Sequence, residues 1–145
     1  AGRRFPPEVL SDAEVRALMD ACGEGIPSCH RNRALIAVLY RGGLRVSEAL
    51  ALYPKDLDPA TGAVRALWGK GGRARTIGLG PGAFRLVEVW TRHRAALGLD
   101  ARHPLFCTRQ GRRITSSYIR RLLIRLGEQA LDDFVNAARA LWLDA

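Results

Sequence analysis

The chain has 145 residues, of which 48% are hydrophobic, so it can bury one core of ordinary domain size. Its 23 Lys and Arg residues outnumber its 14 Asp and Glu residues, which gives a net charge of +9. A domain this basic usually binds a polyanion such as nucleic acid. No apolar run is long enough to span a bilayer, and no secretory signal pattern opens the chain. We therefore expect a cytoplasmic, nucleoid-associated protein.

Cysteine usage argues against a disulfide framework or a zinc site. The chain has three cysteines, Cys22, Cys29 and Cys107, and none of them forms a CxxC pair. An odd number without metal-ligand spacing is typical of reduced, unliganded thiols. We expect neither a metal nor a cofactor.

The first half of the chain predicts three helices. Ser11 and Glu14 form a capping box that opens the first helix, and glycines and a proline end it after Cys22. Residues 29–41 predict a second helix, which is nearly all apolar towards its end and is therefore central. "GLRVSEALAL", residues 43–52, predicts the third.

The middle of the chain changes period and predicts a β-hairpin. Residues 62–79 alternate, with Val64 and Ala66 opposite Arg65 and Leu67. Glycines fill the turn at residues 69–72, as a tight hairpin connection requires.

The second half predicts two further helices and a loop. A long helix starts at Pro81 and stops at Gly98, "HPLFCTRQGRR" is a loop, and Thr115 caps another helix. The predicted fold class is mainly α with a small antiparallel β-sheet, an α+β fold.

Charge divides the chain unevenly. Residues 1–126 carry 22 basic and 10 acidic side chains, whereas residues 127–145 carry one basic and four acidic side chains. The last segment also places apolar residues on one stripe, which predicts an amphipathic helix. The members of this stripe are Leu131, Phe134, Val135, Ala138, Leu141 and Trp142.

Two charged groups stand out as candidates for chemistry. Arg45 and Glu48 lie three residues apart in the third predicted helix, on one face, as a buried pair. Such a pair is either a structural salt bridge in the core or a guanidinium held rigid towards a phosphate. Lys70, on the hairpin turn, is either a solvated residue or an ammonium that donates a proton.

Taken in order, these segments resemble the N-terminal half of the catalytic domain of the tyrosine recombinases, the phage integrase family. "LYRGGLRVSEALAL" looks like the family's first arginine motif, and "WGKGGRARTIGL" looks like its hairpin with the lysine in the turn. "HPLFCTRQGRRIT" resembles the loop that follows, and "LSDAEVRALMDA" resembles the first helix. The resemblance implies a partial integrase-like catalytic domain over residues 1–127, with residues 128–145 as a divergent helix of the same domain.

The resemblance implies DNA integration or site-specific recombination by metal-independent strand transfer through a 3′-phosphotyrosine. By matching position, Arg45 would be the first catalytic arginine, Lys70 the general acid, and Glu48 the residue that orients Arg45. These residue types suit phosphoryl transfer, which needs charge neutralisation at the non-bridging oxygens and an acid at the leaving group.

The family's remaining motifs do not occur in this sequence. None of His30, His93 and His103 has an arginine three residues later in a suitable context, and no tyrosine follows Tyr118. Tyr118 precedes the expected second arginine motif and reads as an amphipathic residue near the surface. We therefore expect a chain that binds DNA but does not cleave it.

Basic residues around these motifs predict a phosphate-tracking surface on double-stranded DNA, joined by a serine at a helix start. The alternative for the arginines is a solvated basic face. The predicted DNA-binding residues are Arg73, Arg75, Arg109, Arg112, Arg113, Ser117, Arg120 and Arg121.

Three hypotheses remain at this point. The first is an incomplete tyrosine recombinase. The second is a non-catalytic DNA-binding or self-associating remnant, with a homo-oligomer formed through the C-terminal helix, since the apolar stripe must be buried somewhere. The third is a relative of the type IB topoisomerases, which share the arginine and hairpin-lysine logic.

Overall fold

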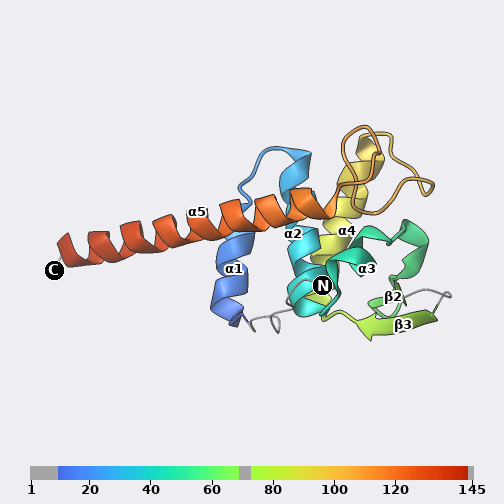
Figure 1. The fold of residues 1–145 in the computed structure, drawn as a ribbon, viewed down its shortest axis with the longest axis horizontal. Coiled ribbons are helices and arrows are strands. Elements are labelled where there is room, and N and C mark those ends of the chain that lie inside the picture. The colour runs from blue at the N-terminus through green and yellow to red at the C-terminus, as the bar shows by residue number, and fades with distance from the viewer. Residues whose placement is uncertain (1–9, 69–72, 144–145) are drawn as a thin grey trace.

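Helices pack beside one small sheet in a computed structural model that describes residues 10–68 and 73–143, without the side chains of 68, 134–138 and 140–143. The sheet has three antiparallel strands in the order β1-β2-β3. Figure 1 shows the sheet at one end and the long helix α5 crossing the helical layer. The predicted class, mainly α with a small antiparallel sheet, is confirmed.

The first helix starts where the sequence predicts, whereas the second starts at Pro27, two residues before the predicted residue 29. Helix α1 spans Asp12–Ala21, and its N-cap Ser11 exchanges hydrogen bonds with Glu14 in a capping box. Helix α2 spans Pro27–Ile36 and packs against α4, which spans Pro81–Ala96. Because α2 is covered on most sides, its apolar second half is fully buried.

The segment that follows α2 differs from the single helix predicted. Residues Ala37–Arg41 form a π-helical turn, η1, before Gly42 ends it. Helix α3 is also shorter than predicted, because it spans only Val46–Leu50 and Arg45 is its extended N-cap. Arg45 and Glu48 therefore do not share a helical face, and their spacing is that of an N-cap and its third helical residue.

The hairpin is confirmed, with a third strand that the sequence did not predict. Strand β1 spans Leu57–Asp58 and follows the short 3₁₀ helix η2, Pro54–Asp56. It pairs with β2, Ala63–Trp68, which pairs in turn with β3, Arg73–Gly78.

Helix α5 spans Ser116–Leu143 as one continuous element. The side chain of Thr115 accepts a hydrogen bond from the backbone of Tyr118, so Thr115 caps the helix as predicted. Gly127 does not interrupt it, since a glycine inside a helix costs only about 1 kcal/mol relative to alanine. The second half of α5 extends beyond the body of the molecule in Figure 1.

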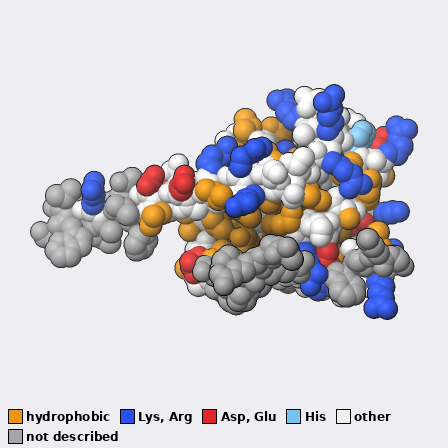
Figure 2. Space-filling view, viewed as in Figure 1, with side chains coloured by type: hydrophobic (Ala, Val, Ile, Leu, Met, Phe, Trp, Pro, Cys, Tyr) orange, Lys and Arg blue, Asp and Glu red, His pale blue; other side chains and the backbone are white. Residues whose placement is uncertain are grey.

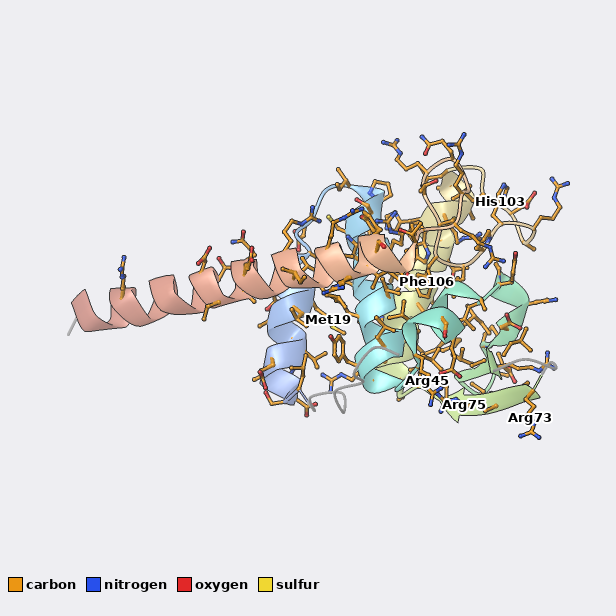
Figure 3. The ribbon with its side chains drawn as sticks, in the orientation of Figure 1. Met19, Arg45, Arg73, Arg75, His103 and Phe106 are labelled. Carbon is orange, nitrogen blue, oxygen red and sulfur yellow. The ribbon has the colours of Figure 1, made fainter. Side chains whose placement is uncertain are left out.

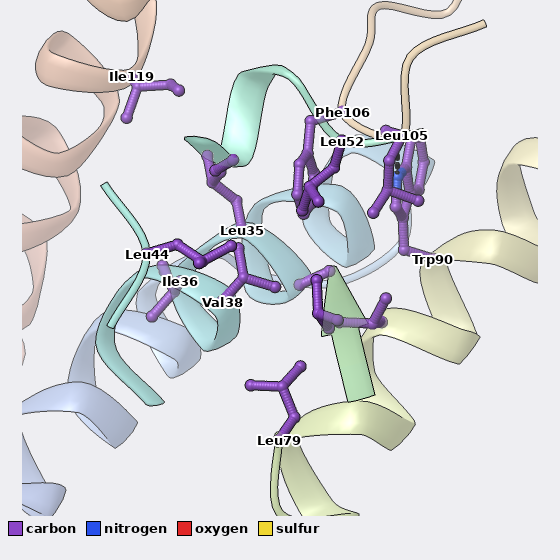
Figure 4. Close-up of a cluster of buried hydrophobic side chains, with 14 of the residues drawn as sticks. Leu35, Ile36, Val38, Leu44, Leu52, Leu79, Trp90, Leu105, Phe106 and Ile119 are labelled. Carbon is purple, nitrogen blue, oxygen red and sulfur yellow. Dashed lines mark hydrogen bonds between the residues drawn. The ribbon is translucent and has the colours of Figure 1, made fainter. Parts of the chain in front are cut away.

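The core lies where α2, α3, α4, α5 and the sheet meet (Figure 4). Its largest fully buried side chains include Leu35, Leu52, Trp90, Phe106 and Ile119. Leu44 and Ala49, on either side of Glu48, belong to the same core. Among the residues that the structure describes, no helix has the length and apolar character needed to cross a membrane.

Candidate active site and nucleic-acid interface

The backbone that carries Arg45 is set by two glycines. A Cβ at Gly42 would lie 2.7 Å from Cδ1 of Ile77 and 2.7 Å from the carbonyl oxygen of Val38, so η1 ends in close contact with β3. Gly43 then takes a φ of +69°, which glycine adopts without strain. This turn brings Arg45 to the surface at the start of α3, where it is exposed. The predicted burial of Arg45 is wrong, because the turn directs the chain outward there.

Glu48 is the buried member of this cluster, with 2% of its side chain exposed. Its Oε1 accepts a hydrogen bond of 2.9 Å from the backbone N–H of Arg45. Its two carboxylate oxygens also bind the guanidinium of Arg75, with Nε donating to Oε2 at 2.9 Å and Nη2 to Oε1 at 2.8 Å. Arg75, more than any other group, holds the pKa of Glu48 below its usual range, and the Arg45 bond also lowers it.

The structure therefore changes the pairing that the sequence suggested. Glu48 holds the backbone of Arg45 and, through its side chain, pairs with Arg75 from β3. The sequence analysis missed this partner because Arg75 lies 27 residues away and reaches Glu48 only through the fold. Figure 3 shows Arg45 and Arg75 together, with Arg73 farther out along the hairpin.

Lys70 lies outside the described residues, in the connection between β2 and β3. The strands on either side of this connection are described up to the pair Trp68 and Arg73. Arg73 is exposed on β3, two residues from Arg75. The role predicted for Lys70 thus stays a prediction.

The loop after α4 is held by buried donors. The indole Nε1 of Trp90 donates to the carbonyl oxygen of Leu105 at 2.7 Å, and Nη2 of Arg94 donates to those of His103 and Pro104 at 2.9 Å. Beyond these anchors, a turn at residues 108–112 presents Arg109 and Arg112 to solvent. The loop is therefore a fixed platform for two exposed guanidiniums.

Arg113 differs from its neighbours in the loop. Its Nη1 donates to the carbonyl oxygen of Leu50 at 3.2 Å, and its Nη2 donates to the hydroxyl of Tyr53 at 2.9 Å. These bonds join the loop to the end of α3. Arg113 thus has an intramolecular task that its position in the sequence did not indicate.

The start of α5 supplies the third group of basic residues. Ser117, Arg120 and Arg121 are exposed, while Ile119 and Leu122 between them are buried. Figure 2 shows basic side chains over the first half of α5 and over the loops beside it. All eight predicted DNA-binding residues are thus exposed, although Arg75 and Arg113 also make hydrogen bonds within the protein.

Two of the tyrosines accept hydrogen bonds from arginine side chains of the same chain. The hydroxyl of Tyr118 accepts a hydrogen bond of 2.7 Å from Nη2 of Arg31, whose guanidinium also lies 5.3 Å from the ring centroid. The hydroxyl of Tyr53 accepts a hydrogen bond from Arg113, and Tyr40 is 37% exposed on η1. None of these contacts involves Arg45.

Two of the histidines form a pair of their own. His30 of α2 and His93 of α4 stack with ring centroids 3.9 Å apart and an angle of 8° between the ring planes. His103 lies in the loop, where its Nδ1 accepts from the backbone N–H of Asp100 at 3.1 Å.

Sequence reasoning missed the buried arginines that brace this region. Arg94 is 3% exposed and Arg31 is 6% exposed. A signal was present, because Arg94 falls at helical spacing from the buried Val87 and Trp90, on the apolar face of α4. A buried arginine at such a position indicates that backbone carbonyls are to be satisfied there.

The fold and the site define a small α+β domain that holds one arginine at a helix start beside a hairpin. The chain belongs to the phage integrase family, the tyrosine recombinases, because residues 8–139 match the model of that family. This match separates the recombinases from the type IB topoisomerases considered above.

Individual relatives agree with the family match. The tyrosine recombinase XerC of Pseudomonas putida is 35% identical over 130 residues, which is 90% of this chain and 43% of the relative. The tyrosine recombinase XerD of Ralstonia nicotianae is 35% identical over 126 residues, 86% of this chain and 41% of the relative. The chain thus spans less than half the length of the curated relatives it matches.

Solved structures share the fold. The crystal structure of the XerA recombinase matches with a TM-score of 0.73 and 26% identity, over 90% of this chain and 46% of the other. A XerH recombinase bound to its difH substrate matches with a TM-score of 0.69 and 25% identity, over 86% and 37%.

Proposed function

We propose that this chain is the part of a tyrosine recombinase that holds DNA and contributes Arg45 and Lys70 to the phosphate site. The observation that carries the proposal is the placement of Arg45, which is exposed while a buried carboxylate fixes its backbone. A positioned cation at the surface suits a phosphate oxygen, because phosphoryl transfer gains from charges that are placed in advance.

In this proposal each residue has one task. Arg45 neutralises a non-bridging oxygen, and Lys70 gives a proton to the leaving 5′ oxygen. Glu48 holds the backbone of Arg45 and stays ionised, since its pKa is lowered. Arg73, Arg109, Arg112, Arg120 and Arg121, with Ser117, track the phosphates of a duplex in the cell's nucleoid.

We further propose that the chain on its own binds DNA without cleaving it. Its sequence has no tyrosine after Tyr118, and the hydroxyl of Tyr118 is bonded to Arg31. A nucleophile needs a hydroxyl that can reach the phosphate, and this one is engaged beside α2.

A nicked duplex tests this second part. Incubation with the chain is expected to give no covalent protein–DNA adduct on a denaturing gel, at concentrations where the duplex is bound. An adduct would contradict the proposal. A Tyr118→Phe variant would then show whether Tyr118 had formed it, because only a Tyr118 adduct would disappear.

A second function is self-association through the C-terminal half of α5. Leu131 is 61% exposed on this helix, at the start of the apolar stripe in the sequence. The rest of this stripe lies outside the described side chains, but an apolar stripe in the sequence of a helix that leaves the body favours a contact with a second copy.

A further inference from the structure

Arg75 is fixed by three acceptors that all belong to the segment carrying Arg45. Besides its two bonds to Glu48, Nη2 of Arg75 donates to the carbonyl oxygen of Gly43 at 3.2 Å. The guanidinium thus joins strand β3 to both ends of the segment 43–48. Two of the three bonds end on one carboxylate in the forked geometry that makes arginine pairs strong.

The burial of Glu48 indicates the role of the Arg75 guanidinium. Glu48 is almost fully buried, whereas 44% of the Arg75 side chain is exposed. A buried carboxylate without a cation is costly, so Glu48 needs Arg75. The fork of Arg75 is occupied by this carboxylate and is not open to grip a phosphate in the same way.

The position of Arg75 in the sheet means that its contact with Glu48 joins two parts of the site. Arg75 is paired with Ala66 in the β2–β3 ladder, and the connection between these strands contains Lys70. The same Glu48 that receives Arg75 also holds the backbone N–H of Arg45. The carboxylate of Glu48 therefore connects β3, the strand that follows Lys70, to Arg45, the N-cap of α3.

We propose that Arg75 is a positioning residue, which clamps the lysine-bearing hairpin onto the Arg45 segment through Glu48, and is not a DNA contact. This replaces the DNA-binding role predicted for Arg75 from its place among basic residues. The proposal rests on the proposed function for the roles of Arg45 and Lys70, whereas the clamp itself is a property of the free protein.

Backbone hydrogen exchange, measured by NMR on the full chain, tests the clamp without DNA. Arg75→Ala and Glu48→Gln are each expected to speed exchange of the β2 and β3 amides about tenfold, as the loss of charged hydrogen bonds predicts. Arg75→Lys keeps the charge but loses the fork, so it too should speed exchange. Arg73→Ala is the matched control, since it removes one charge from the same strand two residues away.

The clamp stands if the Arg75 and Glu48 variants speed hairpin exchange while Arg73→Ala and the α2 amides stay as in the wild type. It is overturned if hairpin exchange is unchanged, if Arg73→Ala has the same effect, or if α2 accelerates equally. In the Arg75→Ala/Glu48→Gln double variant, the effect on exchange should be smaller than the sum of the two single effects, because both substitutions break the same interaction.

A salt series of duplex binding separates the clamp from the proposed function. Arg73→Ala should reduce the slope of log K against log salt by about 0.9, the value for one phosphate contact, and Arg75→Lys should not change it. A wild-type chain that binds no duplex would contradict the proposed function, and hydrogen exchange would still decide on the clamp.

Discussion

Gly42 shows how a missing side chain places a functional one. Its Cα faces Ile77 and the carbonyl of Val38 so closely that η1 and β3 approach each other across it. That approach sets the turn at Gly43 and, two residues later, the exposed position of Arg45. The arginine depends on a contact in which it takes no part.

Replacing Gly42 by alanine should therefore destabilise the protein. The backbone carbonyl of Val38 cannot move aside as a side chain can, so we expect a loss of about 1–3 kcal/mol in the free energy of unfolding. Urea denaturation measures it.

Gly82→Ala provides the control for this substitution. A Cβ at Gly82 in α4 would meet nothing within 4 Å, so stability should hold or rise by up to about 1 kcal/mol. Equal stability of the Gly42→Ala variant and the wild type would show that the close approach is not a constraint.

The stacked histidines predict a pH dependence of stability. Burial lowers the pKa of His30 most, His93 and Arg33 lower it further, and Glu24 acts in the opposite direction. The folded protein thus binds a proton at His30 less readily than the unfolded chain, whose histidine pKa is about 6.5. Stability should fall as the pH falls through about 6.5, until the folded group is protonated as well.

Urea denaturation between about pH 7 and about pH 5 checks this expectation. A His30→Gln variant removes the titrating group, so it should lose less stability over this range than the wild type. Identical losses in the two proteins would mean that His30 does not contribute.

At the scale of elements, the features that depend on neighbouring residues in the sequence could be predicted from it. The capping box of Ser11 and Glu14, the start of α4 at Pro81 and the alternation of Val64 and Ala66 were all confirmed. The short α3, the π-turn η1 and the Arg75–Glu48 pair were not predicted. Each depends on contact between segments far apart in the chain, which periodicity does not record.

Helix α5 behaves as two halves of one element. Among the side chains of α5 that the structure describes, the buried ones, Ile119, Leu122 and Leu126, all precede Gly127. We therefore expect the half beyond Gly127 to contribute little to the stability of the body. Its first exposed apolar residue, Leu131, lies where the helix has left the core.

Truncation after Gly127 should leave the thermal midpoint close to that of the full chain, because no described core residue is lost. If the C-terminal half of α5 mediates self-association, the truncated chain should be monomeric where the full chain is not. Light scattering coupled to size exclusion measures the oligomeric state of the two chains. The same oligomeric state in both chains would contradict self-association through this helix.

At the scale of the whole molecule, the basic part of the sequence is also the part that carries the exposed arginines. Residues 1–126, with 22 basic and 10 acidic side chains, carry a net charge of +12, and residues 127–145 carry −3. The exposed arginines come from the hairpin, the loop after α4 and the start of α5. Arg75 and Arg113 are basic too, but their hydrogen bonds join one part of the molecule to another. Composition predicted a polyanionic partner, whereas only the structure separates exposed arginines that are open to such a partner from arginines that join parts of the molecule.

The central claim is that this fold holds duplex DNA through its exposed arginines. Fluorescence anisotropy with a labelled duplex across a salt series tests it, with an Arg73/Arg112/Arg120/Arg121 alanine variant beside the wild type. An Arg113→Ala variant is the control, since it removes a brace. The wild type should bind at low salt with a steep salt dependence, and the fourfold variant should lose about 3–4 units of slope. Absence of binding at low salt, or an equal slope in the fourfold variant, would contradict the claim.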